Sequence, residues 1–161
     1  MQDLTTFETG CCPRFDPALW QEKEIVFDEK LFLKDHVTSL FHIPLNFGTV
    51  IERDTKKIKK AHAEAEEQLV LSDEKSLWGS DLYIAVGKEV PDAEMERISG
   101  TFLTKAFEGP YSQIGKYSKE MLAYAESKGE KAGKLYYHYA YCPSCAKAYG
   151  NSYTVVFAQV A

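Results

Sequence analysis

The chain has 161 residues, which suits one domain that buries about two-thirds of its unfolded surface. Its formal net charge of −5 gives no overall support for the phosphate attraction that drives nucleic-acid binding, so nucleic acid is not an expected partner. No apolar run approaches the roughly 20 residues that span a bilayer, and the first ten residues lack the basic start and apolar middle of a signal peptide. We therefore expect a cytoplasmic protein with no membrane partner.

The N-terminal 30 residues predict an arm or irregular cap, because Pro13 and Pro17 interrupt regular structure. Phe15, Leu19 and Trp20 are apolar enough to need a surface on which to pack. Trp20 has two open interpretations: it closes the core, or it contacts a ligand. Because only this short arm comes before the first regular elements, no DNA-binding segment is expected ahead of them.

The next part of the chain predicts one strand-rich run, one helix and two strands. The run Leu31–Ile43 is rich in strand formers, and apolar residues near one face predict a helix over about Phe47–Glu66. The lysines of that helix are expected to form a solvated face balanced by nearby glutamates. Strands are predicted at Gln68–Leu71 and Leu82–Val86, with a turn over Asp73–Gly79 between them. Residues Gly87–Gly100 then form a connection.

The clearest local signals lie in Phe107–Gly129, where a strand ends and an amphipathic helix begins. Pro110 suits the first helical position, because its missing N–H would have no partner there, and Gly129 suits a left-handed residue after the helix. Apolar residues recur at helical spacing and predict one buried stripe, formed by Ile114, Tyr117, Met121, Leu122 and Ala125.

The rest of the second half predicts two further strands. The predicted elements are a strand at Thr101–Phe107, a helix at Pro110–Lys128, and strands at Leu135–Tyr141 and Ser152–Val160. The same order, strand–helix–strand–strand, therefore occurs twice, in residues 31–90 and 99–161, after an arm over residues 1–30. Hairpins rather than alternating strand–helix units indicate an α+β fold, with an antiparallel sheet, two helices on one face and a ligand groove between them.

A strand running into Gly109-Pro110-Tyr111 and then into a helix of this length resembles the GyrI-like small-molecule-binding domains. The segments CCPRFDPALW (11–20), FHIPLNFG (41–48) and YCPSCAKAYG (141–150) look like a stand-alone branch of that family, often labelled only "hydrolase". The family includes effector-binding domains of multidrug-responsive bacterial transcription activators. The resemblance implies one domain that binds flat, lipophilic and often cationic compounds with aromatic rings and a buried carboxylate.

Aromatic residues for such a site come from two predicted hairpins. In the strand LYYHYAY, Tyr137 and Tyr139 share one face and are expected at the groove, although packing in the core is the alternative. Trp78 and Tyr83 occupy the corresponding hairpin of the first half, so the repeat places them on the opposite wall.

Glu108 is the first candidate for the carboxylate, because a helix N-terminus favours negative charge; helping to cap that helix is its alternative role. Asp81 is the second candidate, since it opens a strand where the family often carries an acid. His42 falls opposite Glu108 when the halves are aligned, and a His–Glu pair could perform acid–base catalysis. The last strand has Tyr153 or Thr154 where the family usually has an acid, so the recognition scheme is not expected to carry over intact.

The four cysteines leave three possibilities open. Cys11 and Cys12 lie near one end and Cys142 and Cys145 near the other, so folding could assemble a four-thiolate zinc site. A labile disulfide between Cys142 and Cys145 and simple buried thiols are the alternatives. Apart from this possible zinc, no cofactor is expected.

The sequence thus favours a module that binds hydrophobic, cationic or planar small molecules and sequesters or senses them. A hydrolase acting on lipophilic toxic compounds in the same groove is the second hypothesis, related to family members that hydrolyse cyclopropane-containing natural products. A zinc-stabilised structural protein is the third. No nucleophile–base motif is legible in the chain, so an enzymatic role is left uncertain.

Overall fold

The computed structural model describes residues 15–40, 43–44, 47–66, 69–76, 79–141 and 143–161. The chain divides into two compact units. The continuous unit is Phe27–Ser99, and the split unit combines Met1–Val26 with Gly100–Ala161. None of the helices in these described ranges is long and apolar enough to cross a membrane.

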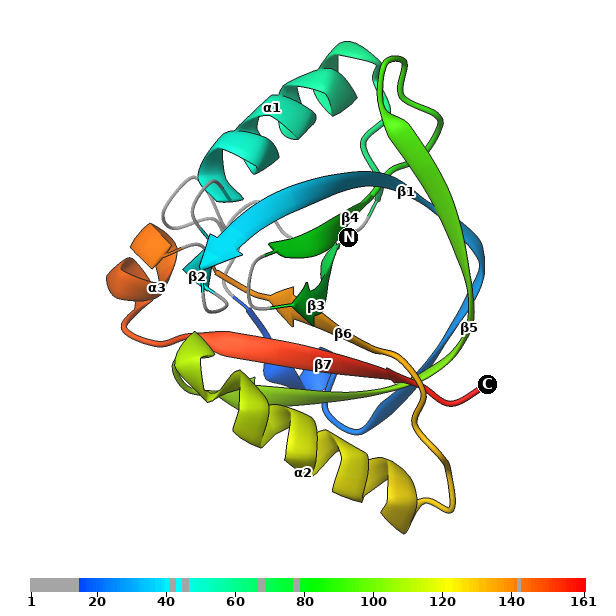
Figure 1. Cartoon of the computed structure of the whole chain (residues 1–161), viewed down its shortest axis with the longest axis vertical. Coiled ribbons are helices and arrows are strands. Elements are labelled where there is room, and N and C mark those ends of the chain that lie inside the picture. The colour runs from blue at the N-terminus through cyan, green and yellow to red at the C-terminus, as the bar shows by residue number, and fades with distance from the viewer. Residues whose placement is uncertain (1–14, 41–42, 45–46, 67–68, 77–78, 142) are drawn as a thin grey trace. The chain divides into compact units, whose positions relative to one another are not determined.

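The continuous unit contains one helix over an antiparallel set of strands (Figure 1). Strand β1 pairs with β4 from Phe32 opposite Ala85 to Thr38 opposite Gly79, and β4 also pairs with β3. The elements are β1 (Lys23–Leu40, which enters from the split unit), β2 (Ile43–Pro44), α1 (Phe47–Lys60), β3 (Val70–Ser76), β4 (Gly79–Ala85) and the start of β5 (Glu94–Glu108).

Helix α1 is held to these strands by its apolar stripe. Val50 packs with Val37 of β1 and Leu82 of β4, and Ile58 packs in a second cluster with Leu33 and Ile84. Since four of these residues are at most 2% exposed, the core of this unit lies between α1 and the β1–β4 pair.

In the split unit, helix α2 lies against a three-stranded antiparallel sheet, beside β7 (Figure 1). Strand β7 is central, pairing with the second half of β5 on one side and with β6 on the other. The elements are η2 (Pro17–Leu19), β5, η3 (Tyr111–Gln113), α2 (Ile114–Ser127), β6 (Leu135–Tyr139), α3 (Pro143–Tyr149) and β7 (Tyr153–Gln159).

The core of the split unit is the predicted stripe of α2 packed on the sheet. Burying this apolar surface is the main favourable term for docking the helix. Leu122, one of the five predicted members of the stripe, is instead 45% exposed, and Ile114 is only partly buried. The buried residues of this cluster are Leu103, Phe107, Tyr117, Met121, Ala125, Tyr137, Val156 and Ala158.

The ends of α2 differ in how well the sequence predicted them. Gly129 has a φ of 74°, which confirms the left-handed residue after the helix. Pro110 lies outside the helix in extended backbone, with φ −70° and ψ 150°, and the short helix η3 comes before α2. The prediction of Pro110 as the first helical residue is therefore wrong by one short turn.

Four other element predictions need correction. Strand β1 begins at Lys23, inside the expected arm, and α1 ends at Lys60 rather than Glu66, because His62 adopts a φ of 53° and turns the chain. Asp73 and the next three residues belong to β3 rather than to a turn, and β5 begins at Glu94 within the expected connection. Helix α3 was not predicted at all. The α+β class with antiparallel pairing is confirmed, whereas the duplicated unit and a shared face for two helices stay predictions.

Candidate functional site

Two predicted ligand contacts, Tyr137 and Tyr139, lie on the face of β6 that packs against α2. The Tyr137 ring is in the core cluster, and its hydroxyl group shares a 2.7 Å hydrogen bond with Ser118 Oγ of α2. The Tyr139 ring meets the Tyr111 ring edge-on, with centroids 4.9 Å apart. Tyr111 Oη in turn donates a 2.6 Å hydrogen bond to the Tyr141 carbonyl. Tyr137 and Tyr139 therefore fix the helix and the loop before it, which is the packing role that the sequence left open.

Trp20 belongs to a second aromatic group, on the other face of β6. Its ring lies 5.4 Å from the Phe157 ring and 6.3 Å from the His138 ring, measured between centroids. Phe157 is fully buried and also contacts Phe102. Because alternate strand residues point to opposite faces, the structure places Trp20 and Tyr137 on opposite sides of this sheet.

Glu108 ends β5 opposite Tyr153, and its side chain is exposed. The expected buried carboxylate is therefore not found at this position. Neither η3 nor α2 has a hydrogen bond from the side chain of its N-cap residue, which is Pro110 for η3 and Gln113 for α2.

Asp81 and Tyr83 share one face of β4 in the continuous unit. Asp81 Oδ1 lies 3.2 Å from His36 Nδ1 on the paired strand β1. Tyr83 is 2% exposed, with its ring edge-on to Phe32 at 6.3 Å and the Lys34 ammonium 5.7 Å from its centroid. The remaining predicted contacts, His42 and Trp78, lie outside the described residues.

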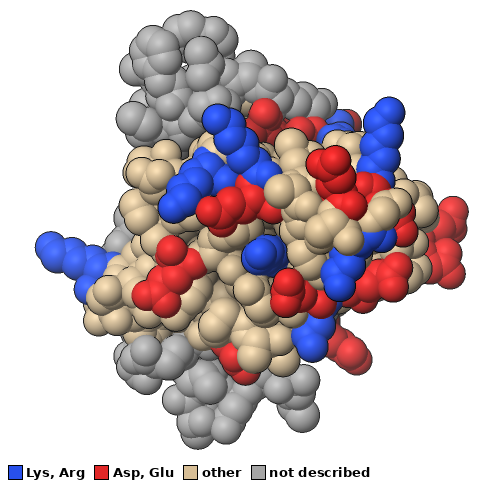
Figure 2. All heavy atoms as spheres, turned by 90° about the horizontal axis from the view of Figure 1, so that it is seen from below, with Lys and Arg blue, Asp and Glu red and all other residues tan. Residues whose placement is uncertain are grey.

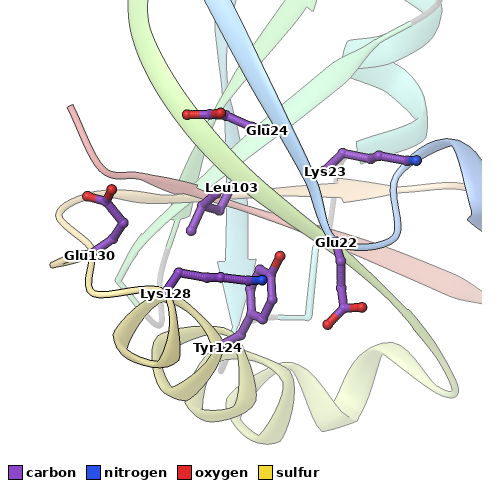
Figure 3. A pocket seen from close by; sticks show the side chains of 7 residues that line it. All are labelled: Glu22, Lys23, Glu24, Leu103, Tyr124, Lys128 and Glu130. Carbon is purple, nitrogen blue, oxygen red and sulfur yellow. The ribbon is translucent and has the colours of Figure 1, made fainter.

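A pocket of about 270 Å³ opens in the split unit, formed by residues that the sequence analysis missed (Figure 3). The apolar lining consists of Leu103 of β5 and Tyr124 of α2. Five charged side chains complete it: Glu22, Lys23 and Glu24 at the start of β1, and Lys128 and Glu130 after α2. No motif links these residues, since they come from three separate segments.

The Tyr124 ring in this pocket already attracts cations. The Lys105 ammonium lies 5.3 Å and the Lys128 ammonium 5.7 Å from the ring centroid, and Figure 3 shows the Lys128 side chain running beside the ring. Ring faces attract positive charge in this geometry. The pocket thus combines an apolar floor, a cation-binding ring and three carboxylates.

A second pocket, of about 230 Å³, lies in the continuous unit and is strongly polar. Asp35 of β1 and Asp54 of α1 both line it, and Arg53 Nη2 donates a 2.6 Å hydrogen bond to Asp35 Oδ2. Asp54 is only 1% exposed. Burial, together with the neighbouring Asp35, raises the pKa of Asp54 to about 7. None of the described residues that line this pocket is aromatic, so it is not the aromatic groove that the sequence predicts.

Charged side chains elsewhere are mixed in sign. The face in Figure 2 shows Lys and Arg next to Asp and Glu, in keeping with ion pairs such as Lys34–Glu96 at 3.3 Å and Lys56–Glu52 at 3.2 Å. Within the described ranges, no group of three or more His, Cys, Asp or Glu side chains is placed to hold a metal ion. Cys11, Cys12 and Cys142 lie outside those ranges, so the zinc and disulfide possibilities stay predictions.

The chain matches the family described as bacterial hydrolase over residues 2–160, and it therefore belongs to that family. No curated protein matches it. A solved structure of the EcmrR C-terminal domain is similar with a TM-score of 0.66 and 14% identity, covering 89% of this chain and 98% of that one. A hydrolase from Listeria innocua is similar with a TM-score of 0.60 and 14% identity, covering 88% and 92%.

A third structure, SAV2435 bound to tetraphenylphosphonium, has a TM-score of 0.51 and 10% identity over 88% of this chain and 94% of that one. At these identities the likeness establishes the fold. The resemblance to GyrI-like domains that the sequence indicated is therefore confirmed at the level of the fold.

Proposed function

We propose that the chain binds small organic cations with an apolar body, and that the split-unit pocket of Figure 3 is where they bind. One observation carries this proposal: the pocket sets Leu103 and Tyr124 beside the carboxylates of Glu22, Glu24 and Glu130. An apolar floor buries the body of the ligand, while the ring face and the carboxylates attract its charge. Tetraphenylphosphonium, which SAV2435 binds, is a compound of this kind.

Lys128 is the group that an incoming cation must displace from Tyr124. Its ammonium and the ligand would compete for the same ring face and the same carboxylates. Removing this charge should therefore favour the ligand, whereas removing the glutamates should oppose it. Opposite effects from neighbouring residues are what a charge-recognising site requires.

The sequence predicts another location for the same ligand, at Glu108, Tyr137 and Tyr139, with Trp20, His42, Trp78, Asp81 and Tyr83 as further contacts. Tyr137 is buried beneath α2 and Glu108 is exposed, so this arrangement would need the Tyr137 packing to change on binding. That location stays a prediction, and the two locations are separable by mutation.

Calorimetric titration with tetraphenylphosphonium and with neutral triphenylphosphine oxide tests the proposal. We expect Glu24→Gln combined with Glu130→Gln to weaken cation binding about tenfold and to leave the neutral compound almost unchanged. Lys128→Met should strengthen cation binding about two- to fivefold. Glu52→Gln, an exposed change on α1, controls for the loss of one negative charge away from the pocket.

Three outcomes would contradict the proposal. They are the absence of saturable tetraphenylphosphonium binding, an equal loss for the cation and the neutral compound, and a loss caused by Glu108→Gln but not by the pocket variants. The last outcome would instead support the location that the sequence predicts, around Glu108. Mass spectrometry of the recovered ligand tests the hydrolase hypothesis for the same compounds. That hypothesis requires the recovered compound to differ in mass from the compound that was added.

A further inference from the structure

The polar pocket of the continuous unit contains a buried acceptor atom that lacks a donor. Asp54 lines this pocket, although it lies between Val50 and Ile58 on the apolar stripe of α1 that packs on the strands. Its side chain is 1% exposed, and its Oδ2 atom has no hydrogen-bond partner among the described residues. A buried acceptor without a donor is destabilising, so Asp54 calls for a donor from outside the chain.

The same pocket offers unused donors. An arginine side chain carries five N–H groups and a lysine side chain carries three. Arg53 Nη2 donates a 2.6 Å hydrogen bond to Asp35 Oδ2, and Lys57 Nζ donates a 3.0 Å hydrogen bond to the Asp92 carbonyl oxygen. In the part of the chain that the structure describes, most of the N–H groups of Arg53 and Lys57 have no acceptor. Both side chains line the pocket, so they are able to bind a carboxylate there.

A ligand with an ammonium group and a carboxylate close together meets both needs. We propose that this pocket binds a free α-amino acid with a small polar side chain. The ammonium group of the ligand donates to Asp54 Oδ2, and its carboxylate accepts hydrogen bonds from Arg53 and Lys57. This site is separate from the cation-binding pocket of the split unit and does not depend on it.

The charges of the wall select a ligand that carries both signs. A purely anionic ligand would face four carboxyl groups, those of Asp35, Asp54, Asp92 and Glu94. A purely cationic ligand would face three cationic side chains, those of Lys34, Arg53 and Lys57. A zwitterion can place each of its charges beside the opposite one, which is the favourable arrangement.

The size and polarity of the pocket limit the rest of the ligand. Of the described residues in the wall, only Leu33 and Ala93 are apolar, so an apolar side chain on the ligand gains little from burial. The volume of about 230 Å³ is below the roughly 300–1,000 Å³ that is typical of pockets for drug-sized ligands. A small amino acid such as serine suits both limits.

Because Asp54 is covered, a neighbouring side chain must move when the ligand binds. Arg53 is able to do so, since its side chain is 52% exposed. Its Nε atom lies 3.8 Å from Asp54 Oδ1, which is beyond hydrogen-bonding distance. A shift of Arg53 opens Asp54 to the ammonium group and brings the guanidinium group to the carboxylate of the ligand.

The test is calorimetric titration of the full chain with L-serine at pH 8. Ethanolamine, which is serine without the carboxylate, and 3-hydroxypropanoate, which is serine without the ammonium group, should each bind at least about tenfold more weakly. L-leucine, which has the same two charges and an apolar side chain, should also bind more weakly than serine.

Two variants assign the two ends of the ligand. Asp54→Asn should weaken serine binding at least about tenfold and leave 3-hydroxypropanoate almost unchanged, because that compound has no ammonium group. Lys57→Met should weaken serine binding about tenfold and leave ethanolamine almost unchanged. Glu52→Gln and Lys56→Met are the matched controls, since Glu52 and Lys56 form an exposed ion pair on the same helix.

The dependence of serine binding on pH gives an independent readout. Burial raises the pKa of Asp54 to about 7, so the ammonium group of the ligand must replace a proton at lower pH. Serine keeps both charges between pH 6 and pH 8. Its binding should therefore tighten over this range, and Asp54→Asn should remove that dependence.

Four results would overturn the proposal. One is the absence of saturable serine binding up to about 10 mM, which would mean that water alone satisfies Asp54. A second is binding of ethanolamine, 3-hydroxypropanoate or leucine that is as tight as that of serine. The third is unchanged serine binding in Asp54→Asn and Lys57→Met while both remain folded by circular dichroism. The fourth is serine binding that weakens from pH 6 to pH 8. None of these results bears on tetraphenylphosphonium binding in the split unit.

Discussion

At the scale of single residues, Gly109 leaves no room for a side chain. A methyl group there would collide with Tyr117 Oη, and the backbone has a φ of 146°. We expect Gly109→Ala to lower the free energy of unfolding by roughly 1–3 kcal/mol. Urea denaturation followed by circular dichroism measures this change.

Two further variants control that prediction. Gly115→Ala, in α2, meets nothing within 4 Å and should be neutral or stabilising by about 0.5–1 kcal/mol, since alanine favours helix. Tyr117→Phe removes the hydroxyl group that the new methyl would strike, so it should recover part of the loss in the Gly109→Ala background. Equal stability of the two alanine variants would contradict the steric explanation.

Asp54 makes the stability of the chain depend on pH. Its pKa is raised from 3.8 to about 7, so the folded chain keeps a proton that the unfolded chain loses, and stability falls as the pH rises between these values. The full shift corresponds to at most about 4 kcal/mol. The lowered pKa of Asp35 adds stability that is lost only at lower pH, as Asp35 itself becomes protonated.

Asp54→Asn should therefore make the free energy of unfolding nearly independent of pH between pH 4.5 and 8, because the neutral amide does not titrate in this range. We expect this variant to be more stable than the natural chain at pH 8. Thermal denaturation across this pH range checks the prediction. A wild-type stability that rises from pH 5 to 8 would show that the sign is wrong.

At the scale of elements, α2 depends on Met121 for its docking. Met121 is fully buried in the cluster with Tyr117 and Ala125, whereas Leu122, one position along, is 45% exposed. We expect Met121→Ala to cost about 2–5 kcal/mol, because it leaves a cavity. Leu122→Ala should cost much less. Denaturant titrations of both variants would test this, and similar losses would mean that α2 is not docked by this face.

The sequence predicted an element well where it carried both an apolar periodicity and a residue that marks the end of the element. The periodic stripe and Gly129 defined α2 to within a few residues. The end of α1 carried no such signal, because His62 adopts a left-handed conformation without being glycine or asparagine. Strand β1 was missed at its start, since its partners are set by tertiary pairing rather than by a sequence pattern.

At the scale of the whole molecule, the sequence predicted the fold class better than it predicted the residues that line the two pockets. Aromatic residues within one strand, such as Tyr137, could be assigned to a face of the sheet from the sequence alone. The pocket of Glu22, Leu103 and Tyr124 could not, because its residues come from segments far apart in the chain. Asp54 gave one overlooked signal, an acid within an apolar helical stripe.

The division into a continuous and a split unit has a consequence for synthesis on the ribosome. All of Phe27–Ser99 leaves the ribosome before the strands that complete the split unit, since β7 ends at Gln159. Until then, Trp20 lacks Phe157, the aromatic residue on which it packs. Trp20 is thus synthesised before Phe27–Ser99 but gains its native aromatic contact only after that unit is complete, and in this interval it is most open to chaperones and to aggregation.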